Sequence, residues 1–223
     1  MSTKENTTRH KAFPVDKEKT TAQELDQFYT NPKVSKRFVE KIDELYGFDN
    51  FDFVIEPSMG EGFIYDFLPT DKRVGLDLEK NHPDCLEGDF LKWTPEKSGI
   101  TWEPLFQQTD KMIFVGNPPF GRSSALALEF FERCSYYSDV VCFIIPRTWM
   151  KFIIHRNIPS DFGLYWQAVL PDASFIHNGK PYEVRCVAQC WSRYDPKPEL
   201  DIEGYEDWRD MDISLDEKSK TDN

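Results

Sequence analysis

The chain has 223 residues and a formal net charge of −12 at pH 7, from 39 acidic and 27 basic residues. This length is enough for one well-buried domain, and the sequence contains no run of about 20 apolar residues that would span a bilayer. So acidic a chain is not expected to coat nucleic acid nonspecifically. A polyanion would bind at a local basic patch or with the help of a partner.

The N-terminus is polar and lacks the apolar core of a signal peptide, so we expect an intracellular protein of the cytoplasm or the nucleus. The five cysteines are odd in number and include no CxxC pair. This pattern predicts reduced, buried thiols and no metal site.

The first part of the chain divides into a charged segment and a helix. Residues 1–20 are charged and show no periodicity, which predicts disorder. Val34, Phe38, Ile42 and Leu45 then recur at helical spacing and predict an amphipathic helix.

Beyond residue 50, apolar runs alternate with helical patterns. A turn and a helix are predicted within 60–68, and a second helix at 124–137. Seven runs predict strands: 51–57, 73–79, 85–93, 111–117, 140–146, 163–171 and 183–193. Continuous apolar strands separated by helices imply an α/β fold with a mostly parallel sheet, covered by helices on both faces. The last run alternates in polarity, which favours an antiparallel seventh strand.

The C-terminal segment, 195–223, contains eleven acidic and four basic residues. Such a charge excess favours a mobile, solvated tail. We therefore expect one domain, 21–194, between a disordered start and an acidic tail. Four apolar residues of the tail could instead form a short docking segment: Tyr205, Trp208, Ile213 and Leu215.

Ligand-compatible residues follow the predicted strands, at the edge where open parallel sheets bind their ligands. The first strand ends in "EPSMGEG", whose glycines allow a ligand to approach the backbone closely. The second ends near Asp77 and Glu79, and either carboxylate can accept two hydrogen bonds from ribose hydroxyls. In the third, Asp89 can accept from an exocyclic amine and Phe90 can stack on a base.

Each of these features alone has a plain structural explanation, either a tight turn or a solvated acid at the end of a strand. The fourth strand ends in "NPPF", residues 117–120. Prolines stop a ladder because they lack an N–H, but they do not explain the flanking Asn and Phe. Four such strand ends in chain order favour a ligand site.

Together, "FYT", "EPSMGEG", "GLDLE", "GDF" and "NPPF" resemble the S-adenosylmethionine-dependent amino-methyltransferases of the adenine-N6 type. The motif order is similar to the gamma arrangement of bacterial and phage DNA adenine methyltransferases, over residues 21 to about 193. The glycine loop departs from that pattern, with Glu56 and Met59 where Asp and Cys are frequent.

The resemblance implies a class I, Rossmann-like methyltransferase fold, S-adenosylmethionine as cofactor, and transfer to adenine N6 in nucleic acid, in DNA rather than RNA. It implies these cofactor-binding residues: Phe28, Tyr29, Thr30, Glu56, Pro57, Ser58, Gly60, Gly62, Asp77, Glu79, Asp89 and Phe90.

The "NPPF" motif gives the resemblance a chemical basis. An adenine amine is a poor nucleophile because its lone pair is delocalised into the ring. The Asn117 side-chain oxygen and the Pro118 carbonyl can both accept from that amine, while Pro119 stiffens the loop. Phe120 can stack on a base swung out of its helix. Without the other motifs, a strand-ending turn with a core Phe would explain the same residues.

Substrate contacts are expected on the same edge. Arg122 and Arg147 could hold phosphates, and Phe175 or Tyr182 could pack against the target base. Each could equally be a surface cation, a core ring or a hairpin ring. DNA adenine methyltransferases usually carry a separate target-recognition domain, and no segment of this sequence resembles one. We therefore expect a protein partner or a homodimer to support any duplex recognition.

Three other activities remain open at this point. An RNA adenine-N6 methyltransferase would use the same four residues. A protein-glutamine methyltransferase would favour Tyr rather than Phe at position 120. A catalytically silent subunit would be favoured by a degraded cofactor loop or by loss of Asn117, and both are intact.

Overall fold

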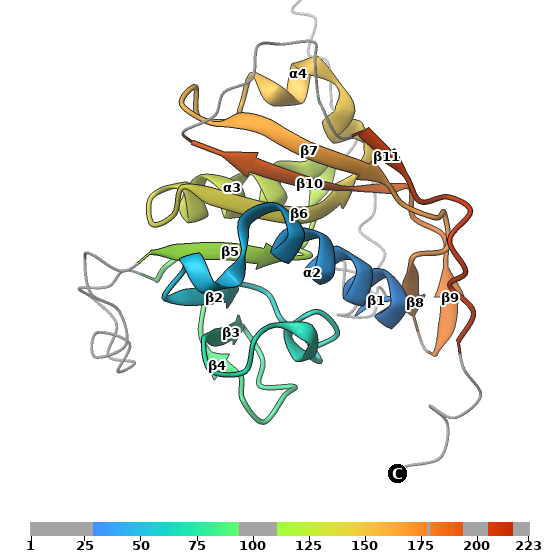
Figure 1. Ribbon diagram of the computed structural model, residues 1–223, viewed down its shortest axis with the longest axis horizontal. Coiled ribbons are helices and arrows are strands. Elements are labelled where there is room, and N and C mark those ends of the chain that lie inside the picture. The colour runs from blue at the N-terminus through green and yellow to red at the C-terminus, as the bar shows by residue number, and fades with distance from the viewer. Residues whose placement is uncertain (1–28, 94–110, 178, 194–204, 216–223) are drawn as a thin grey trace, which may run out of the picture.

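The computed structural model describes residues 29–93, 111–177, 179–193 and 205–215 (Figure 1). The predictions for residues 1–20 and Phe28 concern parts of the chain outside these ranges.

The largest element is an eight-stranded sheet in the order β11-β7-β10-β6-β5-β2-β3-β4. Its strands are β2 (Phe53–Glu56), β3 (Arg73–Asp77), β4 (Leu86–Glu87), β5 (Met112–Gly116), β6 (Val140–Pro146), β7 (Gly163–Val169), β10 (Cys186–Ser192) and β11 (Tyr205–Asp207). All seven predicted strands are present. The predicted antiparallel strand is confirmed as β10, which runs antiparallel to both β6 and β7, whereas the other pairings in the sheet are parallel.

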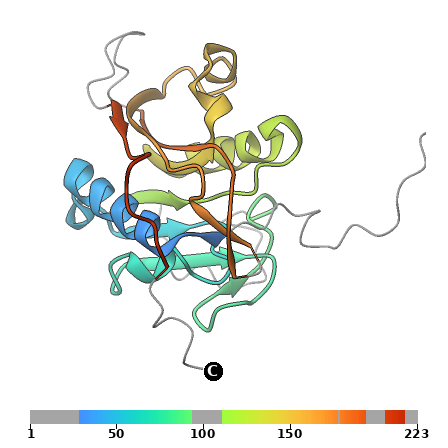
Figure 2. The same ribbon diagram turned by 90° about the vertical axis from the view of Figure 1, so that its right-hand side faces the viewer.

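Helices cover both faces of this sheet, as predicted (Figure 2). On one face, α2 (Pro32–Tyr46) buries Val34, Phe38 and Ile42, and the Asn31 side chain caps its first turn by accepting from Lys33 N–H at 2.9 Å. On the other face lies α3 (Ala125–Ser135), followed after β6 by the short α4 (Phe152–His155). The five cysteines are free and buried, as expected. None of the described helices is long and apolar enough to cross a membrane.

Of the turn and helix predicted at 60–68, the helix is wrong, because only one 3₁₀ turn, η2 (Tyr65–Phe67), forms there. Gly60 and Gly62 have φ of +53° and +88°, which a right-handed helix cannot contain. The other 3₁₀ turns are η1 (Phe48–Asn50), η3 (Arg122–Ser124) and η4 (Arg147–Met150).

A second, three-stranded sheet stands at the carboxyl edge of the large one (Figure 1). It consists of β1 (Tyr29–Thr30), β8 (Phe175–His177) and β9 (Lys180–Tyr182), in the order β1-β8-β9. Thr30 pairs with Phe175 across β1 and β8. This sheet therefore joins the "FYT" motif to a hairpin more than 140 residues later in the chain.

Residues 205–215 dock on the domain, so for this part the solvated tail is wrong and the alternative prediction of a docking segment describes the structure. Residues 205–207 form β11, which adds to β7 in parallel, and Trp208 is buried with its ring 5.5 Å from Trp166. Both indole N–H groups donate to Glu206, at 3.2 and 2.8 Å, and Lys41 pairs with the same carboxylate at 2.9 Å. The contact between Trp166 and Trp208 and their hydrogen bonds to Glu206 thus hold this segment on the domain, although the segment is rich in negative charge.

Candidate active site

The sheet has a topological switch point between β2 and β5. These strands are neighbours, but the chain continues from β2 to β3 on one side and from β5 to β6 on the other. The loops that leave their carboxyl ends therefore diverge and open a crevice. The chain places "EPSMGEG" and "NPPF" at this point.

A cavity of about 260 Å³ fills this crevice. Most of the residues predicted to bind a cofactor line it, together with part of the "NPPF" loop: Tyr29, Thr30, Glu56, Pro57, Ser58, Gly60, Asp77, Glu79, Asp89, Phe90, Asn117 and Pro119. Gly62, Pro118 and Phe120 do not line it. Sequence reasoning missed the apolar wall residues Phe63, Leu126 and Phe130, which carry no motif. Only the position of Phe63 directly after the glycine loop could have suggested it.

The glycine loop is held by Asp77. Its Oδ2 accepts from Gly60 N–H at 2.8 Å, and its Oδ1 accepts from Glu79 N–H at 3.3 Å. A Cβ on Gly60 would lie 3.1 Å from the Tyr29 ring, and one on Gly62 would lie 2.8 Å from the His82 ring. Both positions therefore require glycine, Gly60 at the cavity wall and Gly62 behind it.

The Tyr29 ring lies against Gly60 of the glycine loop. Its ring stacks on Phe63, with centroids 5.3 Å apart. Burial, together with the nearby carboxylates of Glu61, Asp77 and Glu79, raises the pKa of Tyr29 to about 12. The phenol is therefore a neutral donor at physiological pH.

Glu56 is a buried acid in the cavity wall, with 2% of its surface exposed. Burial raises the pKa of its carboxyl well above the ordinary value, and the charges of Asp77 and Asp66 act in the same direction. A hydrogen bond from the Tyr65 backbone N–H opposes the shift. Burial of this acid near two other carboxylates therefore disfavours its charged form.

Buried polar atoms of the wall lack a hydrogen-bond partner among the described residues, and two of them belong to residues predicted to bind the cofactor. These two are Glu56 Oε2 and Thr30 Oγ1. Buried polar groups nearly always have a hydrogen-bond partner, so the lack of one calls for an explanation. A polar ligand in the cavity would supply the missing partners.

Asp89 and Phe90 lie on the far wall. Asp89 Oδ1 accepts from Leu91 N–H at 3.1 Å, and Oδ2 pairs with the exposed Lys92 at 2.8 Å. Phe90 is fixed by aromatic neighbours, with its ring centroid 5.5 Å from that of Phe130. Contacts within the chain thus fix both residues at the cavity wall.

The "NPPF" loop is tied to the glycine loop. Ser58 Oγ donates to the Asn117 carbonyl oxygen at 3.3 Å. Phe120 is largely buried, and its ring meets the fully buried Phe175 edge-to-face at 6.4 Å. The structure therefore brings together two rings that were predicted to contact the target base, but packs them on each other. Their roles toward a base stay predictions.

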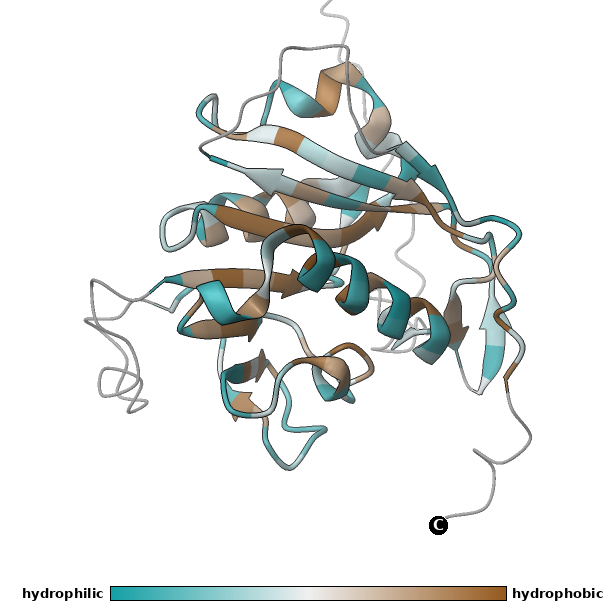
Figure 3. Ribbon diagram, in the orientation of Figure 1, coloured by the Kyte–Doolittle hydropathy of each residue, from teal (hydrophilic) through white to brown (hydrophobic). Residues whose placement is uncertain are grey.

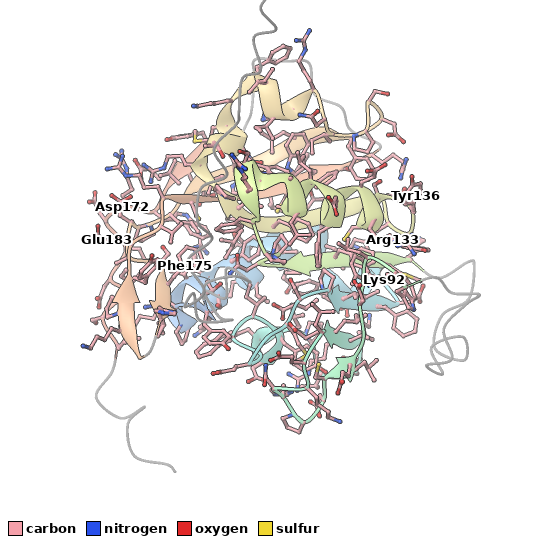
Figure 4. All side chains as sticks on the ribbon, turned by 180° about the vertical axis from the view of Figure 1, so that it is seen from behind. Lys92, Arg133, Tyr136, Asp172, Phe175 and Glu183 are labelled. Atoms are coloured by element: carbon pink, nitrogen blue, oxygen red, sulfur yellow. The ribbon has the colours of Figure 1, made fainter. Side chains whose placement is uncertain are left out.

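The other predicted substrate residues lie outside the cavity, on the same edge. Arg147 donates to Asp172 Oδ1 at 3.2 Å, Arg122 is exposed after the "NPPF" loop, and the Tyr182 ring lies 5.7 Å from His177. Figure 4 shows Asp172, Phe175 and Glu183 together at one end of the molecule, with Arg133 and Tyr136 at the other.

No protein-family model matches the sequence, and no curated protein sequence matches it. Solved structures do match the fold. One is PH1948 of Pyrococcus horikoshii, named as an RNA methyltransferase, with a TM-score of 0.58 and 14% identity over 80% of this chain and 91% of that one. Another is a modification subunit of a type I restriction enzyme from Vibrio vulnificus YJ016, with a TM-score of 0.54 and 15% identity over 76% of this chain and 45% of that one.

A third is lmo1582 of Listeria monocytogenes, named as a class I S-adenosylmethionine-dependent methyltransferase, with a TM-score of 0.53 and 11% identity over 82% of this chain and 65% of that one. The chain has the class I methyltransferase fold. The predicted fold class is thereby confirmed. At these identities the likeness establishes the fold alone, because one fold hosts many activities.

Proposed function

We propose that the protein transfers a methyl group from S-adenosylmethionine to the exocyclic N6 amine of adenine in DNA. The observation that carries the proposal is the position of Asn117. It lines the same cavity as Gly60, Asp77 and Asp89, so the loop proposed to hold the cofactor and the loop proposed to bind the amine meet in one place.

The wall of the cavity suits this cofactor. Of the described residues that line it, four are acidic and none is Lys or Arg, which fits a ligand with a sulfonium and an ammonium group. Glu56 Oε2 and Thr30 Oγ1 offer unpartnered polar atoms. Asp77 would accept from the ribose hydroxyls and Asp89 from the cofactor's adenine amine.

When bound, the cofactor would supply an electrophilic methyl group. The chain supplies the positioning of the target. The Asn117 side-chain oxygen and the Pro118 carbonyl accept from the adenine amine, which favours a pyramidal nitrogen with its lone pair free. Ser58 restrains the Asn117 backbone through its 3.3 Å hydrogen bond. Neither acceptor is a strong base, so the proton lost from the amine passes to solvent.

DNA is the proposed substrate because the motif order resembles DNA adenine methyltransferases, and one solved neighbour is named as a modification subunit of a type I restriction enzyme. A specific observation favours RNA as second candidate: the match to PH1948, named as an RNA methyltransferase, spans 91% of that chain. The proposal includes action in the cytoplasm and a protein partner or homodimer that supports duplex recognition.

Methyl transfer from radiolabelled S-adenosylmethionine to single-stranded DNA, duplex DNA and RNA of one sequence, followed by nucleoside analysis, tests the proposal. We expect label in N6-methyladenine from DNA, and none with Asn117→Ala. Label in another nucleoside, or in protein, would refute the reaction. Label confined to RNA would refute the choice of DNA.

A further inference from the structure

A stripe of basic side chains runs along one side of α2. Lys33, Arg37 and Lys41 follow one another at intervals of four residues, so they are neighbours on the surface of the helix. Figure 3 shows the outward side of α2 in the teal of hydrophilic residues. Glu44 offsets part of this charge, because it pairs with Arg37 at 3.2 Å and with Lys41 at 2.7 Å. Three cations and one acid leave the stripe with a positive balance.

The docked segment, residues 205–215, lies along this stripe (Figure 2). Its contacts, taken along the helix towards the N-terminus of α2, are Lys41 with Glu206 at 2.9 Å, the Arg37 guanidinium over the Trp208 ring at 5.4 Å, and Lys33 with Asp212 at 3.5 Å. The residue numbers fall along the helix while they rise along the segment. The two therefore run in opposite directions, and the segment reaches the first turn of α2.

The segment meets Asn31 at this first turn. Asn31 is buried, and its Nδ2 donates to the Ile213 carbonyl oxygen at 2.9 Å. Its Oδ1 accepts from the Lys33 N–H, and its own backbone N–H donates to the Ser174 carbonyl oxygen at 2.8 Å. One buried residue thus joins the docked segment, α2 and the loop that leads into β8.

Asn31 directly follows Thr30, which lines the cavity. β1 has only two residues, so its own ladder to β8 is short and gives Thr30 little support. Without the Ile213 carbonyl, the buried Asn31 amide would lose its acceptor, which is costly inside a protein. Asn31 would then turn towards another acceptor, and the adjoining Thr30 would move with it.

We propose that Asn31 is a positioning residue, which couples the docking of residues 205–215 to cofactor binding at the cavity wall formed by Thr30. The inference rests on the cofactor of the proposed function and adds a segment that controls its affinity. Docking presents the Ile213 carbonyl, Asn31 binds it, and Thr30 is thereby held in the wall. Because coupling between two sites is reciprocal, the cofactor stabilises the docked segment by the same factor.

Hydrogen exchange of the full chain measures this reciprocal effect without any substitution. Trp208 N–H donates to the Val169 carbonyl oxygen and Met211 N–H to the Trp208 carbonyl oxygen, so both amides report on opening of the segment. Saturating S-adenosylhomocysteine should slow their exchange about 10-fold more than that of the Arg193 N–H. The control amide of Arg193 donates to the Asp139 carbonyl oxygen at the opposite, amino edge of the sheet. Equal slowing of all three amides would overturn the proposal.

Asn31→Ser tests the connection itself, because serine keeps an oxygen that can cap α2 but lacks the donor to Ile213. It should weaken binding of S-adenosylhomocysteine about 10-fold in calorimetry and abolish the additional protection of the Trp208 and Met211 amides. Asn50→Ser is the matched control, because the exposed Asn50 donates to a carbonyl oxygen of the last α2 residue at 2.7 Å. An Asn31→Ser affinity within about threefold of the control would overturn the proposal.

A double variant separates coupling from simple destabilisation. Trp208→Ala releases the segment at its other end and should also weaken cofactor binding about 10-fold. Both substitutions interrupt one connection, so Asn31→Ser with Trp208→Ala should bind about 10-fold, and not about 100-fold, more weakly than wild type. Additive losses would show two independent defects and would overturn the coupling. The exchange experiment on the wild-type chain decides the question if the alanine variant does not fold.

The proposed reaction and this inference fail in different ways. None of these measurements needs methyl transfer. Coupling between the segment and the cofactor, without label in DNA, would support this inference and reject only the proposed reaction. Label in N6-methyladenine, with a segment that does not respond to the cofactor, would reject only this inference.

Discussion

Removal of the Asp77 side chain should weaken cofactor binding in two ways, through the glycine loop and through the proposed ribose contact. The carboxylate holds Gly60 N–H at 2.8 Å and Glu79 N–H at 3.3 Å, and it lines the cavity where the ribose is proposed to bind. Hydrogen bonds from a bound ribose to this charged group would contribute about 1.5–3 kcal/mol each, and they would be lost together with the anchor of the glycine loop. Asp77→Ala should therefore cost about 2–4 kcal/mol of cofactor binding, or about 30- to 1,000-fold in Kd.

Two variants separate the causes. Asp77→Asn keeps one acceptor that can still serve Gly60, so it should fall between Asp77→Ala and wild type. Glu79→Ala is the matched control, because Glu79 lines the same cavity with an exposed side chain. It should bind the cofactor close to the wild-type affinity.

Isothermal titration calorimetry with S-adenosylhomocysteine measures the affinity, and thermal denaturation in the same buffer checks that each variant is folded. An Asp77→Ala affinity within about threefold of wild type would correspond to less than about 0.7 kcal/mol and would refute the loop-anchoring argument. A larger loss of cofactor affinity in Glu79→Ala than in Asp77→Ala would assign ribose binding to Glu79 instead.

Three further predictions concern the core of the site and its support. Glu56 has a raised pKa in the folded state, so its contribution to stability is full below its ordinary pKa of 4.5 and is lost as pH rises towards the folded value. Glu56→Gln should remove this loss and be more stable than wild type at neutral pH, and identical pH–stability curves would contradict it. Asn117→Ala should abolish turnover at unchanged cofactor affinity, and Phe120→Ala should reduce it more than Phe120→Trp; full activity of the Asn117 variant would disprove amine activation. Trp208→Ala should lower the free energy of unfolding by about 3 kcal/mol, while the exposed Tyr205→Ala should change it by less than about 0.5 kcal/mol in urea titrations.

The strands and their ligand-bearing ends could be predicted from the sequence because both are local. Apolar runs such as 111–117 and 140–146 are long enough to identify buried strands. In a parallel sheet their carboxyl ends meet at one edge, so Asp77, Asp89 and Asn117 could be expected together before any coordinates were known.

The local conformation around the glycine loop could not be predicted in the same way. The pattern of "GEGFIYDFL" is apolar enough for a helix, yet Gly60 and Gly62 adopt positive φ. Asp77, from the next strand, accepts the Gly60 N–H, and the Tyr29 and His82 rings leave no room for a Cβ at the two glycines. These partners lie outside the segment, so the hydrophobic periodicity of the segment carries no information about them.

Only the tertiary structure decided the parts that close the site. Residues 29–30 are too short to form a strand alone and do so only because β8 supplies a partner. Residues 205–207 look like part of a solvated tail until Trp166 and Lys41 provide a buried surface and a counter-ion for Trp208 and Glu206. The sequence by itself determined which residues are candidates for the chemistry, because residue type and the position of a residue at a strand end are local. The contacts that hold those residues in place join segments up to 182 residues apart, as between Asn31 and Ile213, and depend on the folded chain.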